Sequence, residues 1–538
     1  MPGEEPLLLP TPHGPNLQWR GIRFYPSEDP TEYARRKARV FSPLQKTLVF
    51  VPSVGLGYGL ENLLQALPAD GAVLCIEAFQ EVMGTAISSG LPRDPRLTIV
   101  RTDDPTAAAA ALRNLGTGRF RRVMELPLSA GYRLAPAVYA GNLHALEQEL
   151  KRYWQNRLTL IALGSLQVRN LISNLPLLAR AEDFGTLSTD MPVMLAGAGP
   201  SLDATLPTIA RLRDRFVLVT VDTALPCFMA GGIHPDIVIA LEAQAANLRD
   251  FVPGLAPESL LACDLSSFPV AARLAVGRLC FFSSDFAPLS LFDRLAEAGL
   301  RPTAIPALGS VGVAGMHAAL RLTRAEVYLT GLDFAYSQSR THARGSPTHV
   351  QMLADSTRLF PVGLASYRAM AGRQLIREPA KDGQSVLTDA VLLSYRDSLR
   401  EQAQQSGGRV FDHGGLGLDL GVRMITAAEL EERLGSVIAP KERLRRDSTH
   451  RFPAHRLPSF LASERTRLER FVELASGCTT SGATVPDELR GLLHELDYTW
   501  IHFPDEPDAG SLDRGFIARV RVAAGYYGQR MARAASIL

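Results

Sequence analysis

The sequence predicts an α/β protein with a Rossmann-like N-terminal domain, a central doubly wound α/β domain and a helical C-terminal domain. Three observations support this prediction. Apolar runs of strand length alternate with helix-length segments, glycine-rich turns follow two of those runs, and the end of the chain is periodic at helical spacing. Because 538 residues exceed what one core holds, we place three domains at 1–145, 146–425 and 426–538.

The composition is that of a globular protein, with 46% hydrophobic and 21% charged residues. The 57 basic and 55 acidic residues nearly balance, so charge gives no reason to expect a nucleic-acid partner. Five scattered cysteines without a C-x-x-C pair argue against a disulfide framework and against a zinc site, so we expect no metal. The first residues lack a signal-peptide pattern and no apolar run approaches 18 residues, so we expect a soluble, cytoplasmic protein without a membrane span.

The first domain begins with a βαβ pattern. An apolar run ends in Gly55, Gly57 and Gly59, an apparent helix follows, and a second run ends at Glu77. An acid about 20 residues after glycines is typical of a nucleotide site, although the spacing here is G-x-G-x-G and not G-x-G-x-x-G. We therefore expect these glycines to serve packing or acceptor recognition; cofactor binding is the alternative. Residues 146–181 then predict one or two helices that link this domain to the next.

The central domain opens with the stretch PVMLAGAGPSLDATLP. An apolar run is followed by a turn that contains Gly197, Gly199, Pro200 and Ser201, and then by a helix. Glycines allow a sharp turn with exposed N–H groups, and a helix N-terminus attracts anions. The pattern predicts a phosphate-binding turn, with an ordinary strand-to-helix turn as the alternative.

Polar residues follow nearly every apolar run of this domain. The positions are Gly197, Asp222, Glu242, Asp264, Ser283, Asp285 and Asp333. In a doubly wound sheet, ligands bind outside the carboxyl ends of the strands. The sequence therefore predicts a ligand cleft with a carboxylate-rich rim.

Two further stretches add candidate residues to this cleft. Gly309 and Ser310 precede an apparent amphipathic helix, where backbone N–H groups and a hydroxyl could hold an anion. Thr341 and His342 lie in a polar loop after Asp333. Because the ordinary pKa of histidine is about 6.5, His342 could act as a general base. A surface histidine bonded to its own loop is the alternative.

The character of the chain changes near residue 426. Thr426 and Glu429 form a capping box, which predicts a helix start. The basic, proline-containing segment 436–458 is typical of a linker or mobile arm, and helical periodicity follows it. We expect this linker and the helices to handle a protein acceptor.

Four ordered blocks of the central domain resemble a known family. AGAGPSLD, DTALPCFMAGGIHPDIVIALEAQ, GSVGVAGMHAAL and GLDFAYSQSRTHARG are similar to the signature blocks of the motility-associated factor (Maf) family. Members are flagellin glycosyltransferases that share a domain with an archaeal hydroxymethyl-dihydropterin pyrophosphokinase. The similarity covers about residues 146–422, and VGLGYGLENLL and CIEAF resemble the family's N-terminal domain.

The resemblance implies a reaction and a set of partners. A nonulosonic acid, such as pseudaminic or legionaminic acid, would pass from a CMP-activated donor to Ser or Thr of flagellin, without a cofactor. The central domain would be similar to bacterial sialyltransferases. Carried over by residue, Gly197, Gly199, Pro200 and Ser201 would hold the nucleotide phosphate, while Asp222, Glu242, Gln244 and Asn247 would face the nucleoside or sugar. Glu242 stands where the family leads us to expect Asp.

In this mechanism His342 is the base for the acceptor hydroxyl. Loop amides together with Ser310 would take up the charge of the departing phosphate. Asp333 would either orient the loop or touch substrate. Two other functions stay open: pyrophosphoryl transfer to a pterin, with the rim acids holding Mg²⁺, and a catalytically silent flagellin-binding protein.

Overall fold

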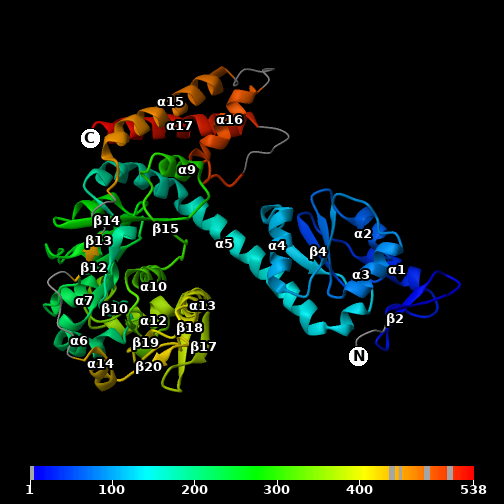
Figure 1. Ribbon diagram of the computed structural model, residues 1–538, viewed down its shortest axis with the longest axis horizontal. Helices are drawn as coiled ribbons and strands as arrows, with labels where there is room; N and C mark the ends of the chain where they lie inside the picture. The colour runs from blue at the N-terminus through cyan, green and yellow to red at the C-terminus, as the bar shows by residue number, and fades with distance from the viewer. Residues whose placement is uncertain (1–4, 436–442, 447–450, 478–484, 506–512) are drawn as a thin grey trace. The chain divides into compact units, whose positions relative to one another are not determined.

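The computed structural model describes residues 5–435, 443–446, 451–477, 485–505 and 513–538. The chain forms two compact units, Met1–Thr159 and Leu160–Leu538. The helix α5 (Pro136–Asn174) belongs partly to each unit (Figure 1). A single long helix therefore occupies most of the segment in which the sequence predicts one or two linking helices.

The first unit is built on a four-stranded parallel sheet with the order β6-β5-β4-β7. The strands are β4 (Thr47–Pro52), β5 (Ala72–Glu77), β6 (Leu97–Arg101) and β7 (Arg122–Glu125), and the helices are α1 (Pro30–Val40), α2 (Leu60–Ala66), α3 (Gln80–Ser88) and α4 (Pro105–Leu115). Every residue of β4 and β5 is buried, which explains their continuous apolar sequences. A small antiparallel sheet of β1 (Leu7–Leu9), β2 (Asn16–Trp19) and β3 (Ile22–Arg23) precedes them.

All three glycines of the glycine-rich turn in the first unit pack closely against other residues of the protein. Gly55, Gly57 and Gly59 have φ values of 57°, 77° and 82°, which favour glycine. A Cβ on Gly57 would lie 2.6 Å from Leu91, and one on Gly59 would lie 2.7 Å from a backbone oxygen of α1. Tyr25 fills the space beside Gly55 in the same way. The structure thus supports the packing interpretation of these glycines.

The carboxylate of Glu77 at the end of β5 is already hydrogen-bonded by other residues of the protein. Its carboxylate accepts hydrogen bonds from the hydroxyls of Ser53 (2.9 Å) and Tyr139 (3.0 Å) and from the backbone N–H groups of Val54 and Phe79. The side chain is fully buried. These contacts use the carboxylate oxygens that would otherwise bind a ribose.

The second unit contains a ten-stranded sheet in which the pairs along the path are parallel. The order is β15-β14-β13-β12-β11-β10-β16-β19-β20, and β8 (Glu182–Asp183) pairs with β14. The strands are β10 (Val193–Ala196), β11 (Val217–Val221), β12 (Ile237–Ala240), β13 (Leu260–Asp264), β14 (Arg278–Ser284), β15 (Ala304–Ile305), β16 (Val327–Thr330), β19 (Val410–Asp412) and β20 (Arg423–Met424). The chain winds from β10 out to β15 and returns to β16 on the other side of β10. The sheet is doubly wound, as predicted, and its switch point lies between β10 and β16.

Alternate residues of these strands enter two cores on opposite faces of the sheet. Leu195 packs in a core with the helices α10 (Val311–Leu322) and α13 (Ala390–Gln405). Its neighbours Met194 and Ala196 pack in another core with α6 (Leu202–Arg211) and α14 (Ala427–Leu434). Shorter helices α7 (Leu225–Ala230), α8 (Pro269–Arg273) and α9 (Ser290–Glu297) complete the layers. Between β16 and α13 the chain adds α11 (Pro347–Ala354), α12 (Val362–Ala371) and the hairpin β17 (Leu375–Pro379) and β18 (Ser385–Asp389).

The end of the chain is helical, as predicted, and packs against the large sheet within the second unit. The helices are α15 (Leu457–Gly477), α16 (Asp487–Glu495) and α17 (Arg514–Ala535) (Figure 1). Phe471 and Tyr527 of these helices share one buried core with Phe281 of β14. Glu464, which is fully buried, accepts two hydrogen bonds from Arg294 of α9, at 2.6 and 3.0 Å. The predicted capping box at the start of α14 is present.

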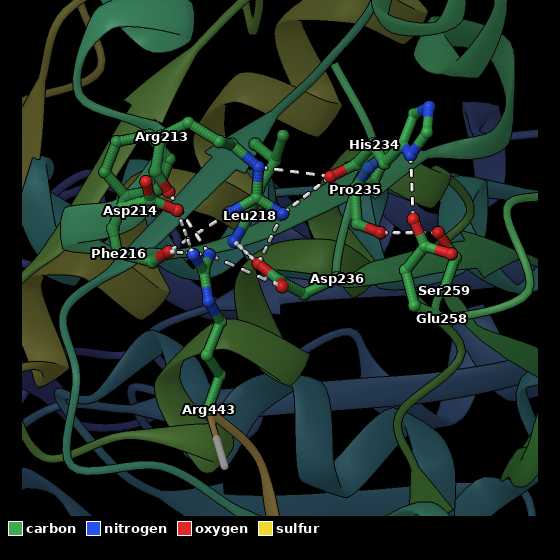
Figure 2. Close-up of polar contacts among 10 residues, drawn as sticks. All are labelled: Arg213, Asp214, Phe216, Leu218, His234, Pro235, Asp236, Glu258, Ser259 and Arg443. Atoms are coloured by element: carbon green, nitrogen blue, oxygen red, sulfur yellow. Dashed lines mark hydrogen bonds and ion pairs between the residues drawn. The ribbon is translucent and has the colours of Figure 1, made fainter. Parts of the chain in front are cut away.

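The segment predicted as a linker or mobile arm is held on the protein in the part that the structure describes; residues 436–442 and 447–450 lie outside it. The guanidinium of Arg443 donates to the backbone oxygens of Arg213 (3.2 Å) and Phe216 (3.4 Å), and it pairs with Asp214 and Asp236 (Figure 2). These partners precede β11 and β12, at the amino ends of the strands. Neighbouring acids therefore hold this arginine on the sheet.

The next described residues of the same segment are also fastened. β21 (Arg445–Arg446) pairs in an antiparallel ladder with β9 (Leu187–Ser188). The side chains pair with Asp190 and Glu182. Three arginines of the basic segment, Arg443, Arg445 and Arg446, are thus paired with acids of the protein.

Two expectations from composition concern cysteines and membranes. Cys75, Cys227, Cys263 and Cys280, which lie in the described ranges, are buried and free. Within those ranges, no helix is long and apolar enough to cross a bilayer.

Candidate active site

The loops that follow β10 and β16 pack tightly together at the switch point. Gly197 N–H donates to the oxygen of Thr330 at 2.8 Å, and Gly199 N–H donates to Gly331 at 2.7 Å. A Cβ on Gly199 would lie 2.7 Å from that same Gly331 oxygen, and one on Gly197 would collide with it as well. Pro200 follows and leads into α6. Both glycines are therefore needed for the close approach of two backbones.

Asp333 fastens the turn from the other side. Its carboxylate accepts from the backbone N–H of Ser201 at 2.9 Å and from the Ser201 hydroxyl. Burial raises the pKa of Asp333 to about 6, while nearby Lys381 and the bonds from Ser201 oppose that shift. Of its two predicted roles, this geometry favours orientation of the loop. The N–H of Ser201 thus donates to Asp333, and those of Gly197 and Gly199 donate to backbone oxygens. The assignment of these three N–H groups to a donor phosphate stays a prediction.

A buried ion pair lies beneath this turn. Lys381 Nζ is 2.6 Å from Asp412 Oδ2, and their side chains are 1% and 2% exposed. Burial raises the pKa of Asp412, and the Lys381 charge opposes it. Asp412 ends β19, whereas Lys381 comes from the turn between β17 and β18. The sequence analysis missed both residues; Asp412 follows the rule of acids at strand ends, but nothing local marks Lys381.

The segment with His342 is anchored to the same turn. Ala343 N–H donates to the backbone oxygen of Ala198 at 2.8 Å. The guanidinium of Arg340 donates to Asp203 in the first turn of α6 at 2.5 Å. His342 and the predicted phosphate turn, which lie about 140 positions apart in sequence, are thus neighbours in the fold.

His342 has an unusual environment for a residue predicted in a polar loop. Its Nδ1 is shielded from solvent and, among the described residues, has no hydrogen-bond partner. Burial and the nearby charge of Arg373 lower its pKa, so the ring is neutral at pH 7. Nδ1 therefore makes no hydrogen bond to the loop of His342, whereas the alternative of a histidine bonded to its own loop stays open for Nε2. Thr341 is half-buried beside it.

Two side chains, Asp389 and Tyr336, hold the Arg373 cation, whose charge acts on His342. The Asp389 carboxylate accepts from Tyr336 Oη at 2.6 Å and from Arg373 Nη1 at 2.9 Å. Asp389 also caps α13 by accepting two backbone N–H bonds. Arg373 and Asp389 were missed in the sequence because they come from the α12–α13 insertion, whose position only the fold determines.

A second polar cluster lies at the carboxyl ends of β11 and β12. Asn247 Nδ2 donates to Asp222 and to Asp250, each at 2.8 Å. Burial raises the pKa of Asp222 to about 6 and that of Asp250 to about 7, and their mutual repulsion adds to the shift of Asp250. Asn247 Oδ1 is buried and, within the described ranges, has no partner. Asp222 and Asn247 come together as predicted, and Asp250 is new.

Two other predicted residues, Glu242 and Gly309, lie near Tyr395 of α13. The charge of Glu242 contributes to the raised pKa of Tyr395, after burial and Asp389. Gly309 is exposed, with φ 67°, and a Cβ there would lie 3.2 Å from the Tyr395 ring. Ser310 occupies the N-cap position of α10, and its side chain makes no capping bond. Gln244 is exposed and donates its N–H to Glu242 at 3.2 Å.

Two acids of the predicted rim are bonded within the protein, and for the buried one, Asp264, the prediction is wrong. Asp264 is buried and accepts from the N–H groups of Ser266 (2.7 Å) and Ser284 (2.6 Å), which joins β13 to β14. Asp285 forms an ion pair with Arg301. The Asp264 carboxylate therefore stabilises the sheet, whereas Asp285 is exposed and its place on the rim stays a prediction.

The fold and the site together define a doubly wound α/β protein with polar groups at its switch point, where such folds bind ligands. Residues 169–339 match the family described as 6-hydroxymethylpterin diphosphokinase MptE-like. The chain is 26% identical to an uncharacterized protein of Treponema pallidum (strain Nichols), over 100% of this chain and 97% of that protein. Another uncharacterized protein of that organism is 28% identical over 28% of this chain.

The similarity in structure extends over nearly the whole chain. The Maf glycosyltransferase from Magnetospirillum magneticum AMB-1 aligns with a TM-score of 0.59 and 17% identity, over 99% of this chain and 89% of that one. The resemblance drawn from the sequence is therefore confirmed at two levels: the chain contains an MptE-like domain, and it has the fold of a Maf glycosyltransferase.

Proposed function

We propose that this protein is a glycosyltransferase that moves a nonulosonic acid from a CMP-activated donor to Ser or Thr of flagellin, with a sialyltransferase-like central domain. The observation that carries the proposal is His342 beside the turn at the switch point: its Nδ1 has no partner among the described residues, and its lowered pKa favours the neutral ring. The full-length likeness to a protein named Maf glycosyltransferase supports the class of reaction.

In the proposed step, the acceptor hydroxyl attacks the anomeric carbon of the donor sugar. His342 accepts the hydroxyl proton while the bond from that carbon to the phosphate oxygen breaks, and CMP departs. The turn of Gly197, Gly199, Pro200 and Ser201 stays the proposed place of the donor phosphate. Because the N–H groups of Gly199 and Ser201 already donate internally, we assign the charge of the departing phosphate to Ser310 and Arg373. A cationic guanidinium suits a phosphate oxygen.

The cluster around Asn247 is assigned to the nucleoside. Cytosine carries an amino group that donates hydrogen bonds. The unpartnered Oδ1 of Asn247 can accept such a bond, and Asp222 and Asp250 fix the amide in place. Glu242 and Gln244 are exposed at the same edge and are assigned to the sugar.

The test is the intact mass of flagellin from cells with and without this protein. Loss of the protein should lower the mass by whole multiples of a nonulosonic acid residue, and His342→Ala should reproduce the loss. An unchanged mass would contradict the proposal. A loss that His342→Ala does not reproduce would favour the silent flagellin-binding protein.

The family match of residues 169–339 favours a second candidate, diphosphoryl transfer to a pterin. It is tested by incubating the purified protein with ATP, Mg²⁺ and hydroxymethyl-dihydropterin and measuring AMP. AMP formation that requires the pterin, together with unmodified flagellin mass, would replace the first function by the second.

A further inference from the structure

A basic pocket lies at the amino edge of the large sheet, away from the switch-point turn. Its volume is about 380 Å³. Helices α10 and α13 run back from the carboxyl edge, and their last turns together with the residues leading into β16 and β19 form its walls. The lining residues are His317, Leu320, Arg321, Arg324, Gln402, Gln405, Ser406 and Arg409.

One arginine of this basic pocket is fixed by the backbone. Arg409 donates to the oxygens of Leu320 (2.9 Å), Thr323 (2.8 Å) and Ala325 (2.9 Å), the last carbonyls of α10 and the turn after it. Burial and the charge of Arg324 lower the pKa of Arg409, so the two guanidiniums are neighbours. The site is therefore rigid on one side.

The positive charge in the basic pocket is not balanced by nearby acids. None of the lining residues is acidic, and within the described part of the chain Arg321, Arg324 and Arg409 form no ion pair. Glu326, two residues after Arg324, pairs with Arg433 instead. Guanidinium groups that are close together without an acid repel one another, and a bound anion would neutralise this repulsion.

We propose that this basic pocket binds the phosphate group of a small hydroxylated phosphate ester, such as a sugar phosphate or a nucleotide. Arg321, Arg324 and Arg409 supply the charge that planar guanidinium groups offer to phosphate. Gln402 Oε1 is buried and, among the described residues, has no partner, so it can accept a bond from a ligand hydroxyl. The concave shape and the neutral Gln405 and Ser406 suit a soluble ester.

The test uses calorimetry on the full chain with inorganic pyrophosphate as the probe. Arg324→Gln and Arg321→Gln should each weaken pyrophosphate binding at least tenfold, because each removes a guanidinium from an exposed position. Arg358→Gln is the matched control: this arginine is also exposed and lies outside the basic pocket. The affinity of Arg358→Gln for pyrophosphate should equal that of the wild type. The affinity of Arg373→Gln should do so too; this change removes the cation that we assign to the donor phosphate and therefore separates this site from the proposed active site.

Two further arms identify the source of the phosphate. Ribose 5-phosphate should lose affinity in Gln402→Met, while pyrophosphate should not; equal behaviour of the two probes would overturn the assignment of a hydroxylated ligand. Vesicles of phosphatidylcholine with phosphatidic acid test a lipid headgroup, and binding to vesicles alone that Arg324→Gln abolishes would assign the phosphate to a lipid. Binding of neither probe, or binding that Arg321→Gln and Arg324→Gln leave unchanged, would overturn the proposal.

Discussion

Replacement of His342 by alanine separates binding from chemistry in the proposed reaction. The Nδ1 atom has no partner among the described residues, so the change breaks no hydrogen bond to that atom that would hold the site together. Donor affinity should stay within about twofold, because we assign the donor to other side chains. Turnover should fall by roughly 10² to 10⁴, or about 2.7 to 5.4 kcal/mol, the usual contribution of a positioned base.

The pH profile gives an independent measure of the same group. Burial and the charge of Arg373 lower the pKa of His342 from its ordinary value, so the base form is favoured at pH 7 and is lost as the pH falls through that lowered pKa. The wild-type rate should therefore be flat above pH 7 and decline in acid, and this acid limb should vanish in His342→Ala. His349→Ala is the control, since His349 lies on α11 seven positions away and its Nδ1 accepts from Gly345 at 3.2 Å.

The assay is flagellin glycosylation at saturating CMP-sugar, with calorimetry for donor affinity. A loss of turnover below about tenfold, which is only about 1.4 kcal/mol, would move the base assignment elsewhere. The same conclusion would follow if His349→Ala and His342→Ala lowered the rate equally.

Three further predictions concern stability, each measured by urea unfolding. Gly199→Ala should destabilise the protein by at least about 2 kcal/mol, because its Cβ would lie 2.7 Å from a backbone oxygen. The control is Gly363→Ala on α12, which should be neutral or stabilising because its Cβ would have nothing within 4 Å. Equal effects of the two changes on the free energy of unfolding would refute the packing argument. Lys381→Met should cost about 3 to 5 kcal/mol by leaving Asp412 buried and unpaired, and Lys381→Met with Asp412→Leu should recover part of it; no recovery would count against the ion pair. The raised pKa of Asp250, about 7, means that its contribution to stability is present in acid and is lost as the pH rises to 7. Asp250→Asn should therefore gain about 2 to 3 kcal/mol relative to wild type between pH 5 and pH 8, and parallel curves would contradict it.

The large sheet could be predicted because its strands bury both faces. A strand buried on both sides is a continuous apolar run, as in β11 and β12, and such runs are visible in sequence. The three residues of β19 and the two of β8 are too short to stand out, and their pairing depends on the strands beside them. Strand β17 alternates between exposed and half-buried residues, so it forms no continuous apolar run in the sequence.

The candidate site could be predicted only where topology alone brings residues together. Asp222 directly follows β11 and Asp333 lies three residues after β16, on either side of β10 in one parallel sheet, so the order of strands places both acids at one edge. The same signal failed for Asp264, because an acid after a strand can bond a local serine as readily as a ligand. Lys381 and Arg373 come from an insertion whose contacts are tertiary, and no spacing in the sequence marks them.

The C-terminal helices show a further limit of predicting structure from hydrophobic periodicity. An apolar stripe indicates that one face of a helix is buried, but it does not show which element buries it. Here α15 and α17 are covered partly by the sheet unit, and Glu464 is buried on α15 because Arg294 of α9 neutralises it. Removing residues 457–538 would expose that shared core and leave Arg294 without its partner. We therefore expect a chain that ends at residue 456 to lose cooperative unfolding and near-ultraviolet circular dichroism, so it cannot serve to separate acceptor recognition from donor binding. A truncated protein that unfolds cooperatively would show that the helices are a separate domain after all, as the sequence suggests.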